Sequence, residues 1–300
     1  MRKSTGTPAV AFNAVGVFRL FGFRVEIRPG FLVFLLLVVV LYGGAQGLWA
    51  AGSIAVFTLI HELGHASAAR ATGSHAEISL DFLAGYASYV PRRRLSGWER
   101  AGIAVAGAGA QFTTAVIVLL LMGANPFSRD DITASYATIS IWWAGVALAV
   151  VNLIPILPLD GGSIVGIFVD WLAPRRGRTM MLWLSVAVSS IGVAAAVTVS
   201  ELQGFLPFAA ILLVLQVQML RAERSLEGLR VRLSPIEFVA ALQQAGRHDD
   251  AAREGAAAFR SAPTAELAAR ISASLSATGD HDGAQAWMGL AEKLTLARRD

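Results

Sequence analysis

Long uncharged runs alternate with short polar stretches through the first two thirds of the chain. Most of these runs approach or exceed the roughly 20 apolar residues that an α-helix needs to cross a bilayer. We therefore predict about six membrane-spanning helices. Their expected ranges are 30–43, 48–71, 101–124, 132–159, 179–200 and 202–220, and the fourth continues through Asp160 towards Trp171.

Composition agrees with this pattern and restricts the chemistry. The chain of 300 residues is 55% hydrophobic and 15% charged, with a mean hydropathy of +0.58, which excludes an ordinary soluble protein. It has no cysteine, so disulfides and thiolate metal sites are excluded. Any transition-metal site must therefore use histidine and carboxylate ligands.

Basic residues mark the ends of the predicted spans. They gather before the first span, between the second and third, between the fourth and fifth, and in the C-terminal tail, whereas the alternate loops hold Arg129 alone. Because cytoplasmic loops carry an excess of Lys and Arg, we expect an integral, multi-pass protein of the cell (plasma or inner) membrane with both termini in the cytoplasm. These arginines indicate the lipid bilayer as a partner and no nucleic acid.

The pattern changes after Leu220. Of the 46 charged residues, 22 lie beyond this point, and the sequence becomes amphipathic and rich in alanine. Two stretches, 241–255 and 274–288, match at an offset of 33 residues, with Gly246 and Gly279 in equivalent positions. A helix–turn–helix repeat of this length resembles the tetratricopeptide type. We expect this tail to contact a protein partner, and a generic helical cap is the alternative.

Three ionisable residues interrupt the second predicted span, in the stretch FTLIHELGHASAAR. His61 and His65 are four residues apart, so they project from one face of a helix and can reach one Zn²⁺. Glu62 is suited to hold a water molecule at the metal and take its proton. Ionisable groups are costly in hydrocarbon and are kept there mainly for a function. The alternative is that both histidines are buried polar residues that make interhelical hydrogen bonds.

Asp160 is the candidate for the third ligand that catalytic zinc usually takes. It interrupts the long fourth segment in the stretch NLIPILPLDGG, where Pro155 and Pro158 break the helix. The topology places it in the cytoplasmic half of the membrane, at a depth comparable with His65. The alternative is a carboxylate at a helix end that reaches the cytoplasm. Asn152, two turns earlier, is expected to bind freed backbone or an incoming peptide, with interhelical packing as the alternative.

The two motifs together, HELGH in one span and NLIPILPLDGG in a later one, resemble those of the site-2 protease family of intramembrane zinc metalloproteases. The resemblance covers roughly residues 20–220 and implies one Zn²⁺ per chain. It implies His61, His65 and Asp160 as the metal ligands. It also implies Glu62 as the general base.

Two further stretches bear on this resemblance. The family often has A-G-P-x-x-N in the intervening span, where this chain reads AGAGAQ, so Ala108 replaces Pro and Gln111 replaces Asn. Gln111 is therefore a candidate substrate contact in place of that Asn. Residues 75–91 resemble the β-hairpin that follows the motif helix in the family, whose edge strand could hold an unwound substrate by strand addition. The alternative is a plain cytoplasmic loop.

The sequence therefore predicts an all-α polytopic membrane protein with about six transmembrane helices, a small β-hairpin after the second, and a small cytoplasmic α-helical domain. We expect a cytoplasmic N-terminal segment at 1–29, a transmembrane zinc protease domain at 30–222 and the helical tail at 223–300.

The predicted function is that of an intramembrane zinc endopeptidase, which hydrolyses a peptide bond in or near the transmembrane segment of a membrane-protein substrate. A non-catalytic membrane scaffold with structural zinc and a partner-recruiting tail is the alternative. The retained Glu62 argues against it, because a structural site needs no base. An ion or metal transporter is disfavoured, since nothing in the chain suggests an inverted repeat.

Overall fold

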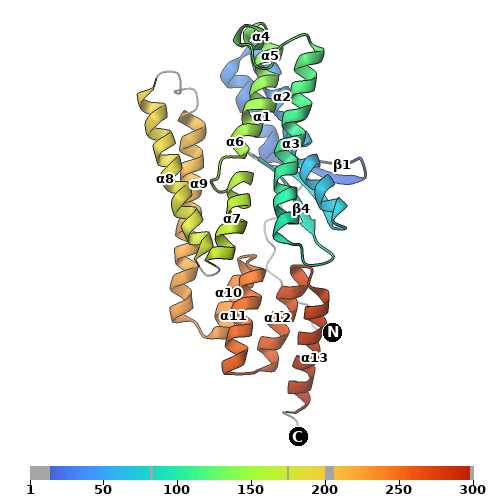
Figure 1. The fold of residues 1–300 in the computed structure, drawn as a ribbon, viewed down its shortest axis with the longest axis vertical. Coiled ribbons are helices and arrows are strands. Elements are labelled where there is room, and N and C mark those ends of the chain that lie inside the picture. Colours follow the sequence, from blue (N-terminus) through green and yellow to red (C-terminus); the bar gives the residue numbers. More distant parts are fainter. Residues whose placement is uncertain (1–13, 82–83, 174–175, 200–205, 298–300) are drawn as a thin grey trace. The chain divides into compact units, whose positions relative to one another are not determined.

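The computed structural model describes residues 14–81, 84–173, 176–199 and 206–297. The ribbon of the chain is drawn in Figure 1. The chain divides into two compact units. The first comprises residues 1–70, 76–89 and 105–152, and the second comprises residues 71–75, 90–104 and 153–300. Each unit is described by itself.

The first unit is built on the long helix α2 (Gly44–Ala71) and most of α3 (Gly97–Leu121). The positive φ angles of Gly43 and Gly44 form the sharp turn between α1 and α2. One further helical run, 136–152, consists of α5 (Tyr136–Ile141), the π-helical turn η1 (Trp142–Ala147) and α6 (Leu148–Asn152). The other helices of the unit are α1 (Pro29–Tyr42) and α4 (Arg129–Thr133).

A small sheet with the strand order β1-β2-β3-β4 also belongs to this unit. The predicted strands after the second long helix are present, as β3 (His75–Asp81) and β4 (Ala84–Val90). The sheet is larger than predicted, because β1 (Gly16–Leu20) and β2 (Phe23–Ile27) join it, with β2 parallel to β3. The expected N-terminal segment therefore contains strands that its short, arginine-interrupted alternation did not reveal.

The second unit contains α7 (Asp160–Leu172), α8 (Gly177–Thr198) and α9 (Leu206–Arg232), with α8 and α9 side by side in Figure 1. Helix α9 runs unbroken past residue 222, where the sequence suggested a domain boundary. The first turns of α3 lie in this unit, where Trp98 meets the Phe168 ring edge to face at 5.8 Å between ring centroids.

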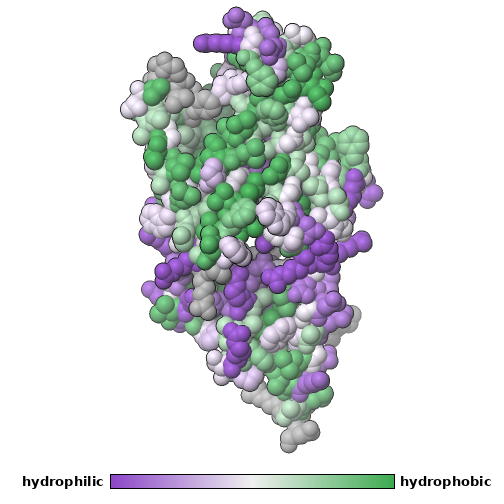
Figure 2. All heavy atoms as spheres, in the orientation of Figure 1, coloured by the Kyte–Doolittle hydropathy of each residue, from purple (hydrophilic) through white to green (hydrophobic). Residues whose placement is uncertain are grey.

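Four of the described helices are long and apolar enough to cross a membrane, namely α2, α3, α8 and α9. Shorter apolar helices occupy 29–42 and 136–152, so the count of six spans stays a prediction. The long helices expose large apolar side chains, and Figure 2 shows hydrophobic residues gathered over them. Lipid contact requires such surface, which a soluble monomer rarely exposes. Examples are Leu120, Ile191 and Val214.

Four short helices form the tail, in two consecutive helix–turn–helix pairs. They are α10 (Pro235–Gln244), α11 (His248–Ser261), α12 (Ala265–Ala277) and α13 (His281–Leu296). The turn of each pair holds a glycine with positive φ, Gly246 at 71° and Gly279 at 83°, which are the equivalent glycines of the sequence repeat. A core that includes Val239, Leu267 and Ile271 joins the helices. The assignment to the tetratricopeptide type stays a prediction.

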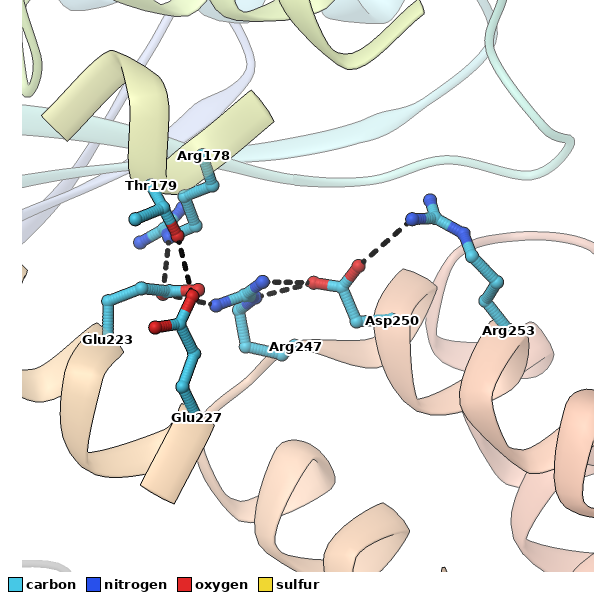
Figure 3. A network of polar contacts seen from close by, with 7 residues as sticks. All are labelled: Arg178, Thr179, Glu223, Glu227, Arg247, Asp250 and Arg253. Carbon is cyan, nitrogen blue, oxygen red and sulfur yellow. Dashed lines mark hydrogen bonds and ion pairs between the residues drawn. The ribbon is translucent and has the colours of Figure 1, made fainter. Parts of the chain in front are cut away.

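A polar network links the tail to the start of α8 and to the C-terminal half of α9 (Figure 3). The Glu223 carboxylate on α9 accepts hydrogen bonds from Arg178 on α8, at 3.2 Å, and from Arg247 beside α11. Arg247 also pairs with Asp250. Burial lowers the pKa of Arg247, but the carboxylates of Asp250 and Glu223 outweigh it and raise the pKa above its usual value. The guanidinium is therefore a permanent charge that needs both carboxylates.

We predict that Glu223→Gln loosens the attachment of the tail. The substitution keeps the shape of the side chain but removes the charge that faces Arg178 and Arg247, and we expect a loss of about 1–3 kcal/mol. Thermal unfolding in detergent and limited proteolysis of the tail measure the effect.

Glu254→Gln is the matched control, because Glu254 pairs with Arg230, whose side chain is 49% exposed. Exposed pairs contribute at most about 1 kcal/mol. Equal stability of the two variants would contradict the role assigned to the network.

Candidate metal centre

Helix α2, in the first unit, carries two histidines on one of its faces. The Nε2 atoms of His61 and His65 are 2.9 Å apart, and the two rings meet edge to face with their centroids 4.5 Å apart. Two nitrogen lone pairs at this distance repel unless a proton or a cation lies between them. Because the two Nε2 atoms lie this close together, the pair fits a metal ion that prefers imidazole ligands.

Glu62 lies on the same helix, one residue after His61. It is 4% exposed, and His61 is 8% exposed, so both groups are removed from solvent. Burial of a carboxylate is costly unless a cation or hydrogen-bond donors compensate it. The predicted general base is therefore buried next to the predicted ligand His61 in the sequence, where a metal ion would balance its charge.

Close packing of α3 against α2 shapes the space around the histidines. A Cβ atom on Gly107 would lie 2.3 Å from His65 Nε2, so only glycine leaves room for this ring. A Cβ atom on Gly64 would lie 2.4 Å from the carbonyl oxygen of Ala106. Small residues at a helix interface allow the backbones to approach in this way. The AGAGAQ stretch is thus the surface against which the HELGH motif packs.

Gln111, the last residue of that stretch, contacts His61. Its Oε1 atom lies 2.8 Å from His61 Nδ1, and its Nε2 atom donates to the carbonyl oxygen of Ala144 at 2.7 Å. The structure therefore brings His61, His65 and Gln111 together in the first unit. The contact between Gln111 and His61 was not predicted, since a sequence does not reveal which residues of two helices lie opposite each other.

Asn152 and Asp160 lie at the two ends of the predicted helix break. Asn152 is the last residue of α6 in the first unit, and Asp160 is the first residue of α7 in the second. Acidic groups are favoured in the first turn of a helix because the macrodipole is positive there. The glycines after Asp160 allow α7 to begin against the preceding turn, since a Cβ on Gly161 would lie 2.2 Å from the carbonyl oxygen of Leu153.

Two polar residues missed by the sequence analysis support this non-helical segment. Ser185 on α8 accepts a hydrogen bond from the backbone nitrogen of Leu157 at 2.8 Å. Gln216 on α9 donates to the carbonyl oxygen of Leu157, also at 2.8 Å. Both side chains are fully buried, and irregular backbone at membrane depth requires such partners. Each is a polar residue inside an apolar run, but not the only one there: Ser189 and Ser190 follow Ser185, and Gln218 follows Gln216. The sequence alone therefore did not single them out.

Comparisons with known proteins found one family model and one curated protein that match parts of the chain. Residues 127–198 match the model of "Peptidase family M50", a range that holds Asn152 and Asp160 but not the HELGH motif. A curated protein of Synechocystis sp. (strain ATCC 27184 / PCC 6803 / Kazusa) is named "Putative zinc metalloprotease sll0528". It is 27% identical in an alignment of 209 positions, which covers 60% of this chain and 53% of that protein. The chain thus spans about half the length of this relative.

A solved structure is also similar to the chain. It is titled "Site-2 Protease from Methanocaldococcus jannaschii" and matches with a TM-score of 0.43 and 21% sequence identity, covering 69% of this chain and 92% of that one.

We predict that Gly107→Ala disrupts the paired histidines. The added methyl group would lie 2.3 Å from His65 Nε2, so the ring must turn away from His61 or the helices must separate. We expect a stability loss of about 1–3 kcal/mol, typical of overpacking, together with weaker binding of a divalent metal ion. Thermal unfolding and bound metal per chain measure the two effects.

Gly109→Ala is the matched control, two residues further along the same helix. A Cβ atom there meets nothing within 4 Å, so the variant should be as stable as the wild type or more stable by about 0.5–1 kcal/mol. Equal stability and equal metal binding of Gly107→Ala and Gly109→Ala would show that the His65 ring does not need the space at Gly107.

Proposed function

We propose that this relative of the M50 metallopeptidases is an intramembrane zinc endopeptidase. It would hydrolyse a peptide bond in or near the transmembrane segment of a membrane-protein substrate. The observation that carries the proposal is the pair of facing imidazoles, with Nε2 atoms 2.9 Å apart and a buried glutamate beside them. They lie on a helix that is long and apolar enough to cross a membrane.

We assign His61, His65 and Asp160 as the ligands of one zinc ion per chain; these three side chains are of the types that could hold an ion together. Two neutral histidines and one carboxylate form a ligand set that catalytic zinc sites use. With Glu62 also ionised, the site and its Zn²⁺ would be neutral, which favours it in a low-dielectric region. Asp160 also lies within the residues that match the family model.

Glu62 would transfer protons during hydrolysis. When bound, zinc supplies Lewis-acid chemistry that lowers the pKa of water and polarises the scissile carbonyl. Glu62 takes the proton from the attacking water and gives it to the amine leaving group as the peptide bond breaks. Its burial excludes bulk water and leaves the carboxylate as the proton acceptor beside the histidines.

The substrate would bind as an extended strand. A transmembrane helix hides its own peptide bonds, so a segment must unwind before water can attack it. The sheet order makes β4 an outer strand, to which an extended segment can add through backbone hydrogen bonds. Asn152, at the end of α6, is proposed as a further contact for this segment.

We place both termini in the cytoplasm, with the tail available to a protein partner. The exposed arginines between β4 and α3 support this orientation, because cytoplasmic loops of membrane proteins are enriched in basic residues. In this arrangement the strand that binds substrate lies near the cytoplasmic surface of the cell membrane.

The first test separates catalysis from metal binding. Glu62→Gln should bind as much zinc as the wild type but cleave a panel of single-span substrates at least about 10²-fold more slowly, because the general base is lost. A chelator should abolish wild-type cleavage, and added zinc should restore it. Equal cleavage by wild type and Glu62→Gln would refute the assigned base. Zinc binding without cleavage of any substrate would favour the scaffold alternative.

The second test examines the third ligand. Asp160→Ala should lower the affinity for zinc in a chelator competition, because two histidines alone hold the ion more weakly than three ligands. Asp170→Asn, which removes an acid from the same helix α7, should leave zinc affinity unchanged. Undiminished zinc binding in Asp160→Ala would refute the assignment.

A further inference from the structure

The amide of Gln111 has an orientation that its two contacts determine. Gln111 is 3% exposed, and one end of its amide faces the carbonyl oxygen of Ala144 at 2.7 Å. A carbonyl oxygen can only accept, so the NH₂ group must be at that end. The oxygen of the amide therefore faces His61 Nδ1, at 2.8 Å.

This orientation determines the tautomer of His61. The Gln111 oxygen accepts but cannot donate, so Nδ1 of His61 must carry the proton. A neutral imidazole has one N–H group, which leaves Nε2 with its lone pair. That Nε2 atom is the one that faces His65 Nε2. It is thus in the form that a metal ion requires of a histidine ligand.

The carbonyl group of Ala144, which accepts the hydrogen bond from Gln111, is itself held in place. Ala144 lies in the π-helical turn η1, and such turns occur frequently at functional sites. Ala144 is 2% exposed, and the next residue, Gly145, approaches α2 and α3 closely. A Cβ atom on Gly145 would lie 2.2 Å from the Ala115 side chain and 3.0 Å from the Phe57 ring. The carbonyl that orients Gln111 is therefore part of the packed core.

We propose that Gln111 is a positioning residue of the metal centre: it selects the Nδ1–H tautomer of His61 and holds the ring with Nε2 aimed at the ion. Hydrogen bonds of this kind orient metal-bound histidines and raise their basicity. The inference rests on the proposed zinc site but not on proteolysis. It gives Gln111 a role in metal binding in place of the substrate contact that the sequence suggested.

The length of the side chain fits this role. Gln111 contacts His61 with one end of its amide and Ala144 with the other. Asparagine is one methylene shorter and cannot reach both from the same backbone position. A glutamate could accept from Nδ1–H, but it would place a carboxylate oxygen against the Ala144 carbonyl. Glutamine alone supplies an acceptor for the ring and a donor for the backbone at this reach.

Three variants separate positioning from packing. Gln111→Leu keeps most of the volume but removes the acceptor, and it should weaken zinc binding about 10–100-fold in a chelator competition. Gln111→Glu keeps the acceptor and loses the donor, so it should retain an affinity near that of the wild type while its thermal stability falls. A purely packing role predicts the reverse order. Gln111→Asn should bind zinc with intermediate affinity.

Gln243→Leu is the matched control. Gln243 is partly buried and donates two hydrogen bonds, at 2.8 Å to the carbonyl oxygen of Arg270 and at 2.9 Å to Ser274 Oγ, but it lies in the tail. Its loss should leave zinc affinity unchanged.

A second readout needs no metal. Nitrogen NMR of the metal-free protein should find His61 protonated on Nδ1 in the wild type and in Gln111→Glu, and a mixture of tautomers in Gln111→Leu. Zinc binding that is insensitive to Gln111→Leu, or equally weak in Gln111→Leu and Gln111→Glu, would overturn the inference while the proposed function stands. A wild type that binds no zinc would overturn both.

Discussion

The close contact between α2 and α3 is the constraint on which the first unit depends. Lipid tails are as apolar as leucine, so helices in a bilayer gain little from the hydrophobic effect and associate through close packing and hydrogen bonds. Here Gly64 and Gly107 allow the two backbones to approach. Only at this separation can the Gln111 side chain reach His61 and the His65 ring fit beside Gly107.

A second constraint is that the non-helical backbone before α7 needs hydrogen-bond partners on the surrounding helices. Residues 153–159 are not helical, yet the backbone of Leu157 is bonded on both sides, to Ser185 and to Gln216. This allows α7 to begin within the bundle, with Asp160 at its N-terminus. A carboxylate there is favoured by the macrodipole. Ser185 on α8 and Gln216 on α9 thus hold the backbone segment that leads to Asp160 at the start of α7.

The sequence was sufficient for features that depend on local pattern. The helix that carries His61 and His65, the break before Asp160 and the helical tail follow from spacing, glycines and prolines. The strands after that helix were expected from the resemblance to the site-2 protease family. Features that depend on which distant segments meet were missed. The pairing of β2 with β3, the contact of Gln111 with His61 and the support of Leu157 by Gln216 each require the register of two segments far apart in the chain.

The matched spacing of α2 and α3 has a consequence for how the proposed substrate would enter. Gly107 and Gln111 are four residues apart on α3, as are His61 and His65 on α2, and each meets one histidine. A slide of α3 by a single residue would press a methyl group into the His65 ring and withdraw the glutamine from His61. The two helices are therefore locked in register and must move as a single body. Under the proposed function, any gate that admits a polypeptide would have to be formed by other elements, so that the histidines keep their geometry while the gate opens.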